Sequence, residues 1–354
     1  MTYPLLTLQT TSITAYRTKN HLNTLFFVRV GFKVAKIPEL KQGVVVNAVT
    51  EIRAAGSRDE TFQQFEVTPA TPVLGAYISD LHLADISEAA AEELRQALWR
   101  YGVLFLRNQQ LTPAQLSKAG RLFGPQLEEH TFGKTLVDEG YPEVLVIEQM
   151  QSDRAKTTTD IWHHDVTARQ HPNLVSVLQA SEVPFGADTM WTSAAAAFEW
   201  LPRALQVLYL SLDVEHDTTY MALRHDFAPA DKLAELVALG ETAVHPAVIR
   251  HPFNDRLCLF VGNGYTKRVH GYSAEQGEHL IKLAIEQAKI PEIQVRLQWQ
   301  PGDVAIWDNL GTLHYGVTGD LRNQRRLLHR VAAWSPDIRP SLDREAAIAA
   351  VTAA

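Results

Sequence analysis

Residues 293–307 read IQVRLQWQPGDVAIW and indicate two β-strands separated by a tight turn. Between Ile293 and Trp299 apolar and polar residues alternate, which is typical of a strand with one buried face. Pro301-Gly302-Asp303 supplies the residues that turns favour, and Val304–Trp307 then reads as the next strand. This stretch therefore predicts a fold built on β-sheets.

Short strands with turn signals recur along the rest of the chain. We expect them at residues 65–68, 74–78, 103–106, 144–147, 174–179 and 326–332. Helices are expected at residues 85–100, 112–122, 193–212 and 273–289, the first with Asp85 at its start and the last capped by Ser273 with Gln276. The fold class that follows is β-rich α+β, a double-stranded β-helix (jelly roll) flanked by helices.

The pattern defines one domain at residues 63–340, with an extension before it and an Ala-rich C-terminal tail at residues 341–354. The extension, residues 1–62, has no assigned role. Its first 38 residues contain no Asp or Glu but several Lys and Arg, a bias found in transit peptides. A disordered extension and a start codon placed too far upstream are the alternatives.

Composition narrows the function classes. The chain has 354 residues, of which 46% are hydrophobic and 21% charged, as in an ordinary soluble enzyme. A net charge of −7 argues against nucleic acid or an anionic membrane as partner, and no apolar run reaches the length of a membrane span. Cys258 is the only cysteine, which excludes an internal disulfide and Cys-rich metal sites. A cytoplasmic location fits best, with organellar import through the basic N-terminus as the alternative, and a homo-oligomer is compatible with the sequence.

Three residues form a candidate metal site. In an extended strand, His163 and Asp165 point to the same face, so both can bind one ion while His164 points away. His314, far along the chain, supplies a second imidazole. Two histidines and one carboxylate are the ligand set of non-haem Fe(II) oxygenases. Taken singly, each histidine is better interpreted as a hydrogen-bonded core residue, and the metal site is favoured only when the three residues are considered together.

Two arginines add an anion-binding element. Arg326 and Arg330 lie four residues apart in a predicted strand, and both therefore project to one face together with Leu328. Buried guanidinium groups need anionic partners, and arginine binds carboxylates and sulfonates with two hydrogen bonds. A solvated edge strand is the alternative for these arginines.

The chain from about Phe65 to Trp334 resembles the taurine dioxygenase family of Fe(II)/2-oxoglutarate-dependent dioxygenases. The resemblance rests on four segments in this order: 162–167 (WHHDVT), 187–193 (ADTMWTS), 299–309 (WQPGDVAIWDN) and 325–330 (RRLLHR). It implies that His163, Asp165 and His314 hold Fe(II). It also implies that Thr189 and Arg326 bind the distal carboxylate of 2-oxoglutarate, whose other end chelates the metal.

The same resemblance implies a substrate pocket. Arg330 would face the anionic group of the substrate, and His130 matches a family histidine that helps to bind a sulfonate. Tyr265 is expected to contribute a ring. Thr159 stands where the taurine enzymes have an asparagine, and Thr218 replaces an aromatic residue. The anion-binding residues are thus kept while the amine-contacting ones are changed, which argues against taurine as the substrate.

The resemblance thus implies an enzyme that uses Fe(II), 2-oxoglutarate and O2 to hydroxylate the carbon next to sulfur in a small organosulfonate or alkyl sulfate. An aldehyde and sulfite or sulfate would be released from this small anionic substrate. Oxidation of another organic acid, such as an aryloxyalkanoate, is the rival within the class, since Arg330 alone does not distinguish the two anions. A non-enzymatic jelly-roll binding protein is the rival from another class. A structural zinc site would take four protein ligands, and only three are evident.

Overall fold

The structure is a computed structural model. It describes residues 13–15, 28–30, 59, 61–130, 133–149, 161–224, 230–317 and 324–353, without the side chains of 13–15, 28–30 and 230–232. The chain divides into two compact units, Met1–Thr50 and Glu51–Ala354. In the first unit, β1 (Ile13–Ala15) pairs antiparallel with β2 (Val28–Val30). In the second unit, Asp59 and Phe62 are already buried.

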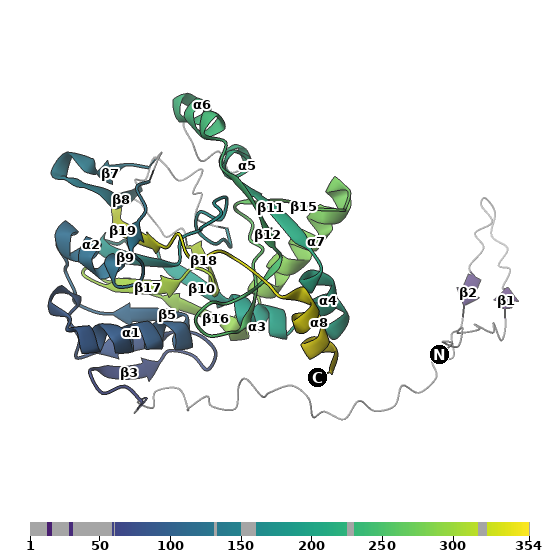
Figure 1. Ribbon diagram of the computed structural model, residues 1–354, viewed down its shortest axis with the longest axis horizontal. Coiled ribbons are helices and arrows are strands. Elements are labelled where there is room, and N and C mark those ends of the chain that lie inside the picture. The colour runs from purple at the N-terminus through teal and green to yellow at the C-terminus, as the bar shows by residue number, and fades with distance from the viewer. Residues whose placement is uncertain are drawn as a thin grey trace, which may run out of the picture. The chain divides into compact units, whose positions relative to one another are not determined.

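The second unit is built on a large sheet that runs through its centre (Figure 1). In spatial order its strands are β3 (Glu66–Pro69), β4 (Ala76–Ser79), β5 (Val103–Leu106), β17 (Val304–Asp308), β9 (Val175–Glu182), β19 (Arg326–Trp334), β8 (Tyr141–Gln149) and β7 (Thr135–Leu136), with β6 (Gln126–Leu127) also paired to β19. Only the β4–β5 pair is parallel among these pairs. The predicted strands at 103–106 and 326–332 are therefore confirmed, and each pairs with strands far away in the sequence.

A smaller sheet packs against the large one. It consists of β16 (Gln294–Leu297), β10 (Thr189–Ser193) and β18 (Thr312–Gly316), in that order. Trp191 and Leu297 from this sheet meet Phe105, Trp307 and other residues of the large sheet in one buried apolar cluster. The stretch 293–307 thus does not form a hairpin of paired strands. Its turn carries the chain from the small sheet into the large one, because β16 pairs with β10 and β17 pairs with β5 and β9.

Two further strand groups and a set of helices complete the unit. The strands are β12 (Thr242–Pro246), β11 (Asp213–Asp217) and β15 (Thr266–Val269) in one sheet, and β13 (Val248–Arg250) with β14 (Leu257–Leu259) in another. The helices are η1 (Leu83–Asp85), α1 (Glu88–Tyr101), α2 (Pro113–Arg121), η2 (Val137–Glu139), α3 (Ala194–Glu199), α4 (Arg203–Leu210), α5 (Thr218–Arg224), α6 (Ala230–Leu239), α7 (Ala274–Ala288), η4 (Pro291–Ile293) and α8 (Arg344–Ala353). Within the described residues, none of these helices is both long enough and apolar enough to span a bilayer.

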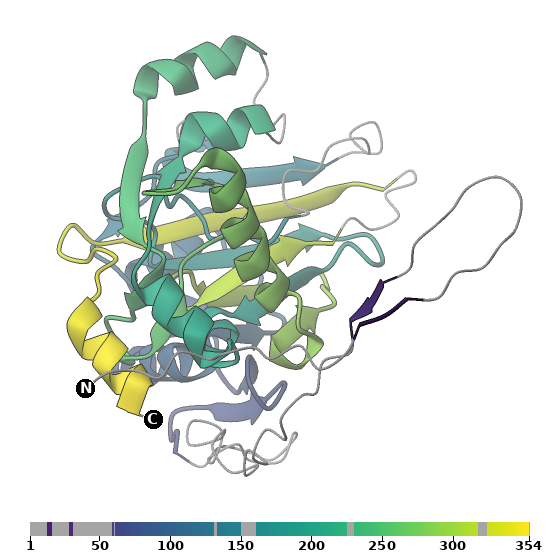
Figure 2. The same cartoon turned by 90° about the vertical axis from the view of Figure 1, so that its right-hand side faces the viewer.

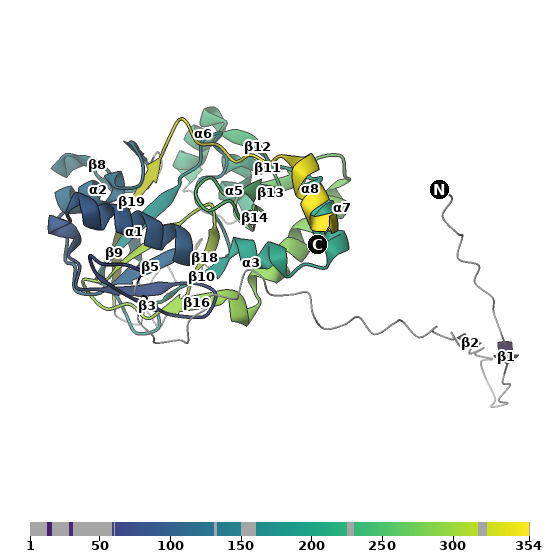
Figure 3. The same ribbon diagram turned by 60° about the horizontal axis from the view of Figure 1, so that its bottom comes forward.

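Helices α1 and α2 cover the outer face of the large sheet, where α1 lies along β5 (Figure 3). Thr112 caps α2 and forms a capping box with Gln115. The expected start of α1 at Asp85 is wrong by three residues. Asp85 ends a short 3-10 turn, and Ser87 caps the α-helix by accepting a hydrogen bond from the amide of Ala90.

The helix predicted at 193–212 is two helices, α3 and α4. Ser193 caps α3, which ends at Glu199, and Pro202 is the N-cap of α4. Proline lacks the amide hydrogen and clashes with the carbonyl of the preceding turn, so a continuous helix could not pass this position. The tail forms α8, which packs on α4 and buries Ala347 in the core (Figure 2). The capping box of α7, Ser273 with Gln276, is confirmed.

Candidate active site

Backbone pairing brings the two candidate histidine ligands together. His314 lies in β18, and His163 forms an isolated antiparallel bridge with it. The amide of His163 donates to the carbonyl of His314 at 3.1 Å, and the amide of His314 donates back at 2.9 Å. The expected extended strand around His163 is therefore only one bridged residue long, but the bridge sets the two rings 4.1 Å apart, centroid to centroid.

The three candidate ligand atoms form a group of the right size for a metal ion. Oδ1 of Asp165 lies 3.9 Å from Nε2 of His163 and 3.7 Å from Nε2 of His314. All three residues are buried, and their ligand atoms lie within 4.8 Å of one another. Metal–ligand bonds of about 2.0–2.2 Å fit between atoms with this spacing. Among the described residues, this is the one such group of histidine and carboxylate side chains.

The tautomer of His163 suits metal binding. Its Nδ1 lies 2.7 Å from the carbonyl oxygen of Ile161, so Nδ1 carries the proton and Nε2 presents a lone pair. His164 points away, as predicted. Its Nδ1 donates to the carbonyl of Asn309 at 2.8 Å, and its ring packs 4.8 Å from the ring of Phe260. His164 is thus a buried structural residue, and burial lowers its pKa to about 4.

The two oxygens of Asp165 have different neighbours. Oδ1 faces the histidines, whereas Oδ2 accepts a hydrogen bond from Nη1 of Arg330 at 2.7 Å and another from Ser176 at 3.2 Å. Burial alone would raise the pKa of this carboxyl group, but the Arg330 guanidinium and the nearby histidines hold it below its ordinary value. Asp165 therefore stays ionised, with one oxygen for a metal and one for arginine.

Sequence reasoning did not assign a role to Asn309, which holds this loop in place. Its Oδ1 accepts from the amide of Asp165 at 2.8 Å, and its Nδ2 donates to the carbonyls of Asp165 at 2.9 Å and Asn173 at 2.8 Å. The next residue after the aspartate, Val166, has a φ of 52°, which is unfavourable for a β-branched residue. Strain of this kind persists only where surrounding contacts impose the conformation.

Arg326 and Thr189 lie in the two facing sheets. Arg326 begins β19 and is only 4% exposed; its Nη1 donates to Gln149 at 3.4 Å, and its Nε has no partner among the described residues. Burial lowers the pKa of Arg326 to about 10, although the negative charge of Asp188 acts to raise it. Asp188 is itself paired with Arg296 at 2.7 Å. A buried guanidinium with so little compensation fits a carboxylate ligand. The hydroxyl of the buried Thr189 accepts from the indole nitrogen of Trp299 at 3.0 Å.

Two candidate substrate residues, His130 and Tyr265, lie near enough to Arg330 and Asp165 to interact with them electrostatically. Arg330 is buried and its predicted face in β19 is confirmed, so it is not part of a solvated edge. Nδ1 of His130 accepts from the amide of Gly133 at 2.9 Å, which leaves the proton of the neutral ring on Nε2. Burial lowers the pKa of His130 to about 4. Tyr265 is buried with Ala168 and Met221. Thr159 lies outside the described residues.

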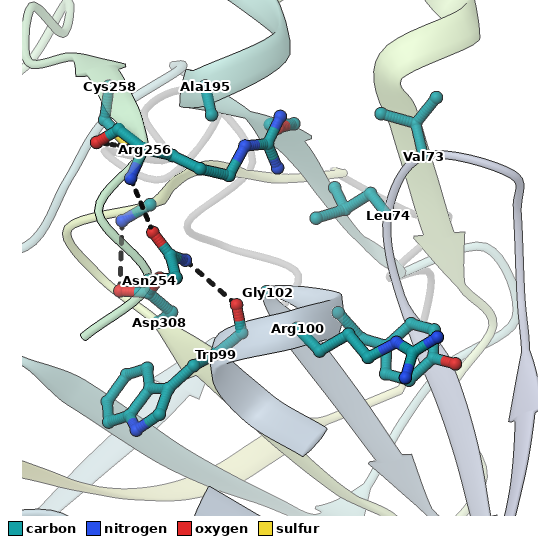
Figure 4. Close-up of a pocket in the computed structure, with 13 residues that line it drawn as sticks. Val73, Leu74, Trp99, Arg100, Gly102, Ala195, Asn254, Arg256, Cys258 and Asp308 are labelled. Atoms are coloured by element: carbon teal, nitrogen blue, oxygen red, sulfur yellow. Dashed lines mark hydrogen bonds between the residues drawn. The ribbon is translucent and has the colours of Figure 1, made fainter. Parts of the chain in front are cut away.

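A small cavity elsewhere in the unit has none of these residues in its lining (Figure 4). Asn254 stands at its edge, where its Nδ2 donates to the carbonyl of Trp99 at 2.9 Å and its Oδ1 accepts from the amide of Arg256 at 3.2 Å. The cavity volume is about 20 Å³, which holds roughly one water molecule. It is too small for an organic substrate.

Comparison with known proteins agrees with this geometry. The family described as Taurine catabolism dioxygenase TauD, TfdA matches residues 66–332. An alpha-ketoglutarate-dependent sulfate ester dioxygenase from Pseudomonas putida is 32% identical over 278 residues, covering 76% of this chain and 89% of that protein. An alkylsulfatase from Acinetobacter baylyi is 31% identical over 277 residues, covering 76% of this chain and 84% of that protein.

A solved structure confirms the jelly-roll fold. A taurine dioxygenase from Burkholderia xenovorans superposes with a TM-score of 0.65 at 28% sequence identity, covering 81% of this chain and 99% of that chain. Alpha-ketoglutarate is another name for 2-oxoglutarate. With a family match over most of its length and a metal-sized group of two histidines and an aspartate, the chain belongs to the TauD/TfdA family and is an Fe(II)- and 2-oxoglutarate-dependent dioxygenase.

Proposed function

We propose that this dioxygenase hydroxylates the carbon that bears the sulfate or sulfonate group in a small alkyl sulfate or organosulfonate. The observation that carries the proposal is the buried Arg330, which lies 2.7 Å from Oδ2 of the metal-site aspartate and so stands next to the reacting centre. The relatives from P. putida and A. baylyi, named for sulfate esters, support it. Hydroxylation of a carbon that bears a sulfate group gives an unstable product. Its C–O bond to sulfate breaks as the new hydroxyl becomes a carbonyl, so an aldehyde and sulfate leave; a sulfonate would lose sulfite through its C–S bond.

In this proposal His163, Asp165 and His314 hold the iron. Bound Fe(II), with 2-oxoglutarate and O2, supplies the oxidising power needed to attack a C–H bond. The protein supplies three of the ligands on one side and leaves the other positions open. The His163 ring is fixed by its bond to Ile161, and the aspartate by its bond to Arg330, so the ligand atoms are held in place before the metal arrives.

Arg326 and Thr189 would bind the distal carboxylate of 2-oxoglutarate. Arg326 offers a buried positive charge whose Nε has no hydrogen-bond partner within the described ranges, and such a group binds a carboxylate through two charge-assisted hydrogen bonds. The Thr189 hydroxyl already accepts from Trp299, so its own hydrogen can be donated to the carboxylate. Binding there would compensate a guanidinium whose burial is otherwise costly.

Arg330 and His130 would hold the sulfate or sulfonate group, and Tyr265 would contact the organic part. The neutral His130 carries its proton on Nε2 and can donate it to a sulfate oxygen. The apolar cluster of Tyr265, Ala168 and Met221 suits an alkyl chain better than an amine. A head group fixed beside the metal places the adjacent carbon for oxidation and excludes other positions. The role of Thr159 in the substrate pocket stays a prediction.

The test is product release from a substrate panel. Enzyme loaded with Fe(II) and 2-oxoglutarate is given alkyl sulfates, alkylsulfonates including taurine, and aryloxyalkanoates, with succinate, sulfate, sulfite and phenol measured. We expect sulfate or sulfite in a one-to-one ratio with succinate, and little turnover of taurine. Phenol release from the aryloxyacids, without sulfate or sulfite from any sulfur compound, would replace the proposal by its rival. An Arg330→Met variant should lose most activity toward every anion.

A cytoplasmic location is part of the same proposal. The single cysteine, Cys258, is a buried free thiol, and such a chain needs no oxidising compartment to fold.

A further inference from the structure

Arg330 has a second buried carboxylate beside it, that of Glu128. Nη2 of Arg330 lies 3.2 Å from Oε2 of Glu128, and the Glu128 side chain is only 4% exposed. The same Oε2 accepts from Nδ2 of Asn173 at 2.7 Å, while Oε1 lies 3.7 Å from Nη1 of Arg169. Main-chain pairing fixes this position, because the amide of Glu128 donates to the carbonyl of Ala332 in β19 at 2.8 Å.

Charges of alternating sign run outward from the metal site. Asp165 pairs with Arg330, Arg330 with Glu128, Glu128 with Arg169, and Arg169 with Glu241 at 2.8 Å. Three carboxylates against two guanidiniums leave one negative charge in this row. The two charges of a ferrous ion and the two of 2-oxoglutarate cancel each other. Arg330 is therefore already engaged by two carboxylates before a substrate anion arrives.

We propose that Glu128 is a specificity-determining residue that restricts the anion site to head groups with a single negative charge and rejects dianions of the same shape. The inference rests on the proposed function, in which Arg330 binds the sulfate group. Sulfate esters and sulfonates carry one charge. A phosphate monoester has nearly the same tetrahedral shape but loses a second proton with a pKa of about 6, so it is a dianion at neutral pH.

The physical basis is a like-charge interaction at short range. A head group bound to Arg330 would lie on the far side of a guanidinium whose Nη2 is 3.2 Å from Glu128. Arg330 already pairs with Asp165 and Glu128, so a bound head group is repelled by Glu128 in proportion to its negative charge, and a dianion is repelled about twice as strongly as a monoanion. Like charges on either side of one guanidinium in a buried site lower affinity by about tenfold or more. Rejection of this kind needs no steric difference between the ligands.

The experiment measures binding of two ligands of matched shape, hexyl sulfate and hexyl phosphate. Anaerobic enzyme loaded with Fe(II) and 2-oxoglutarate is titrated calorimetrically with each at pH 7.5. We expect the wild-type protein to bind hexyl sulfate at least tenfold more tightly than hexyl phosphate. Glu128→Gln should narrow that ratio by about tenfold, chiefly by improving the binding of the phosphate.

Three controls separate charge from shape and from folding. Glu129→Gln removes the same charge from the neighbouring exposed residue and should leave the ratio unchanged. Glu128→Asp keeps the charge and should retain the preference for sulfate. Lowering the pH to 5.5 converts most hexyl phosphate to its monoanion, so its affinity for the wild-type protein should rise severalfold relative to hexyl sulfate. The last measurement needs no variant.

The outcomes are distinct. An unchanged sulfate-to-phosphate ratio in folded Glu128→Gln, with hexyl sulfate still bound tightly, overturns the role of Glu128 and leaves the proposed function standing. An equal effect of Glu129→Gln, or loss of the preference in Glu128→Asp, also overturns it, because the ratio would then reflect bulk charge or shape. Failure of the wild-type protein to bind hexyl sulfate or any other sulfur anion removes both proposals. A residue that only orients Arg330 would change both affinities together.

Discussion

Asn309→Ala should weaken metal binding, although Asn309 is not one of the candidate metal ligands. The asparagine is fully buried, and its side chain makes hydrogen bonds to the amide and carbonyl of Asp165 and to the carbonyl of Asn173. Alanine leaves three buried backbone groups without these partners. Each such group costs about 1–3 kcal/mol, and a water molecule that enters the vacated space would recover part of that cost.

We therefore expect the free energy of unfolding of the metal-free protein to fall by about 3–5 kcal/mol in Asn309→Ala. The loop that presents Asp165 would also lose its fixed orientation. Loss of an outer residue that orients a ligand typically weakens metal binding 10–100-fold, and we expect a change of that order. Anaerobic Fe(II) titration in the presence of 2-oxoglutarate, followed by the weak visible charge-transfer band, measures the affinity.

Asn254→Ala is the matched control. Asn254 also bonds two backbone groups, those of Trp99 and Arg256, but at the small cavity that none of the metal-site residues lines. This variant should lose stability and bind Fe(II) like the wild-type protein. If folded Asn309→Ala binds Fe(II) with wild-type affinity, or if both variants weaken binding alike, the positioning role of Asn309 is refuted.

Three further predictions concern stability, the co-substrate and pH. An added methyl group on Gly311 would overlap Oδ2 of Asp308, so Gly311→Ala should lower the free energy of unfolding by about 1–3 kcal/mol. Gly277→Ala is the control, because the nearest atom to its added methyl group is 3.4 Å away, and it should not lower the free energy of unfolding. Equal urea denaturation midpoints for the two variants would contradict the prediction. Arg326→Met should raise KM for 2-oxoglutarate about 100-fold in a succinate assay, and an unchanged KM would exclude the proposed contact. His130 has a pKa of about 4 in the folded protein and about 6.5 when unfolded, so the unfolded state binds the extra proton between these values. The contribution of neutral His130 to stability is therefore complete above pH 6.5 and is lost as the pH falls toward 4. Urea denaturation of the metal-free protein at pH 7.5 and 5.5 measures this loss, and we expect a lower midpoint at pH 5.5.

Local patterns in the sequence predicted much of the scaffold. The capping box of α7 depends only on Ser273 and Gln276, three residues apart, and is present where expected. The two-residue period of β19 correctly placed Arg326, Leu328 and Arg330 on one buried face. The helix expected across Pro202 was wrong, although proline is itself a local signal for the break.

The amino-acid sequence by itself thus identified the candidate site residues and, through the resemblance, the class of enzyme. Only the tertiary structure decided how they meet. His163 faces His314 through a single long-range bridge, and Asn309 and Glu128 acquire their partners from segments far away in the chain. Side-chain periodicity fixes the face a residue occupies within its own strand, but the residue opposite depends on strand register and sheet order. Those are set by packing of the whole core.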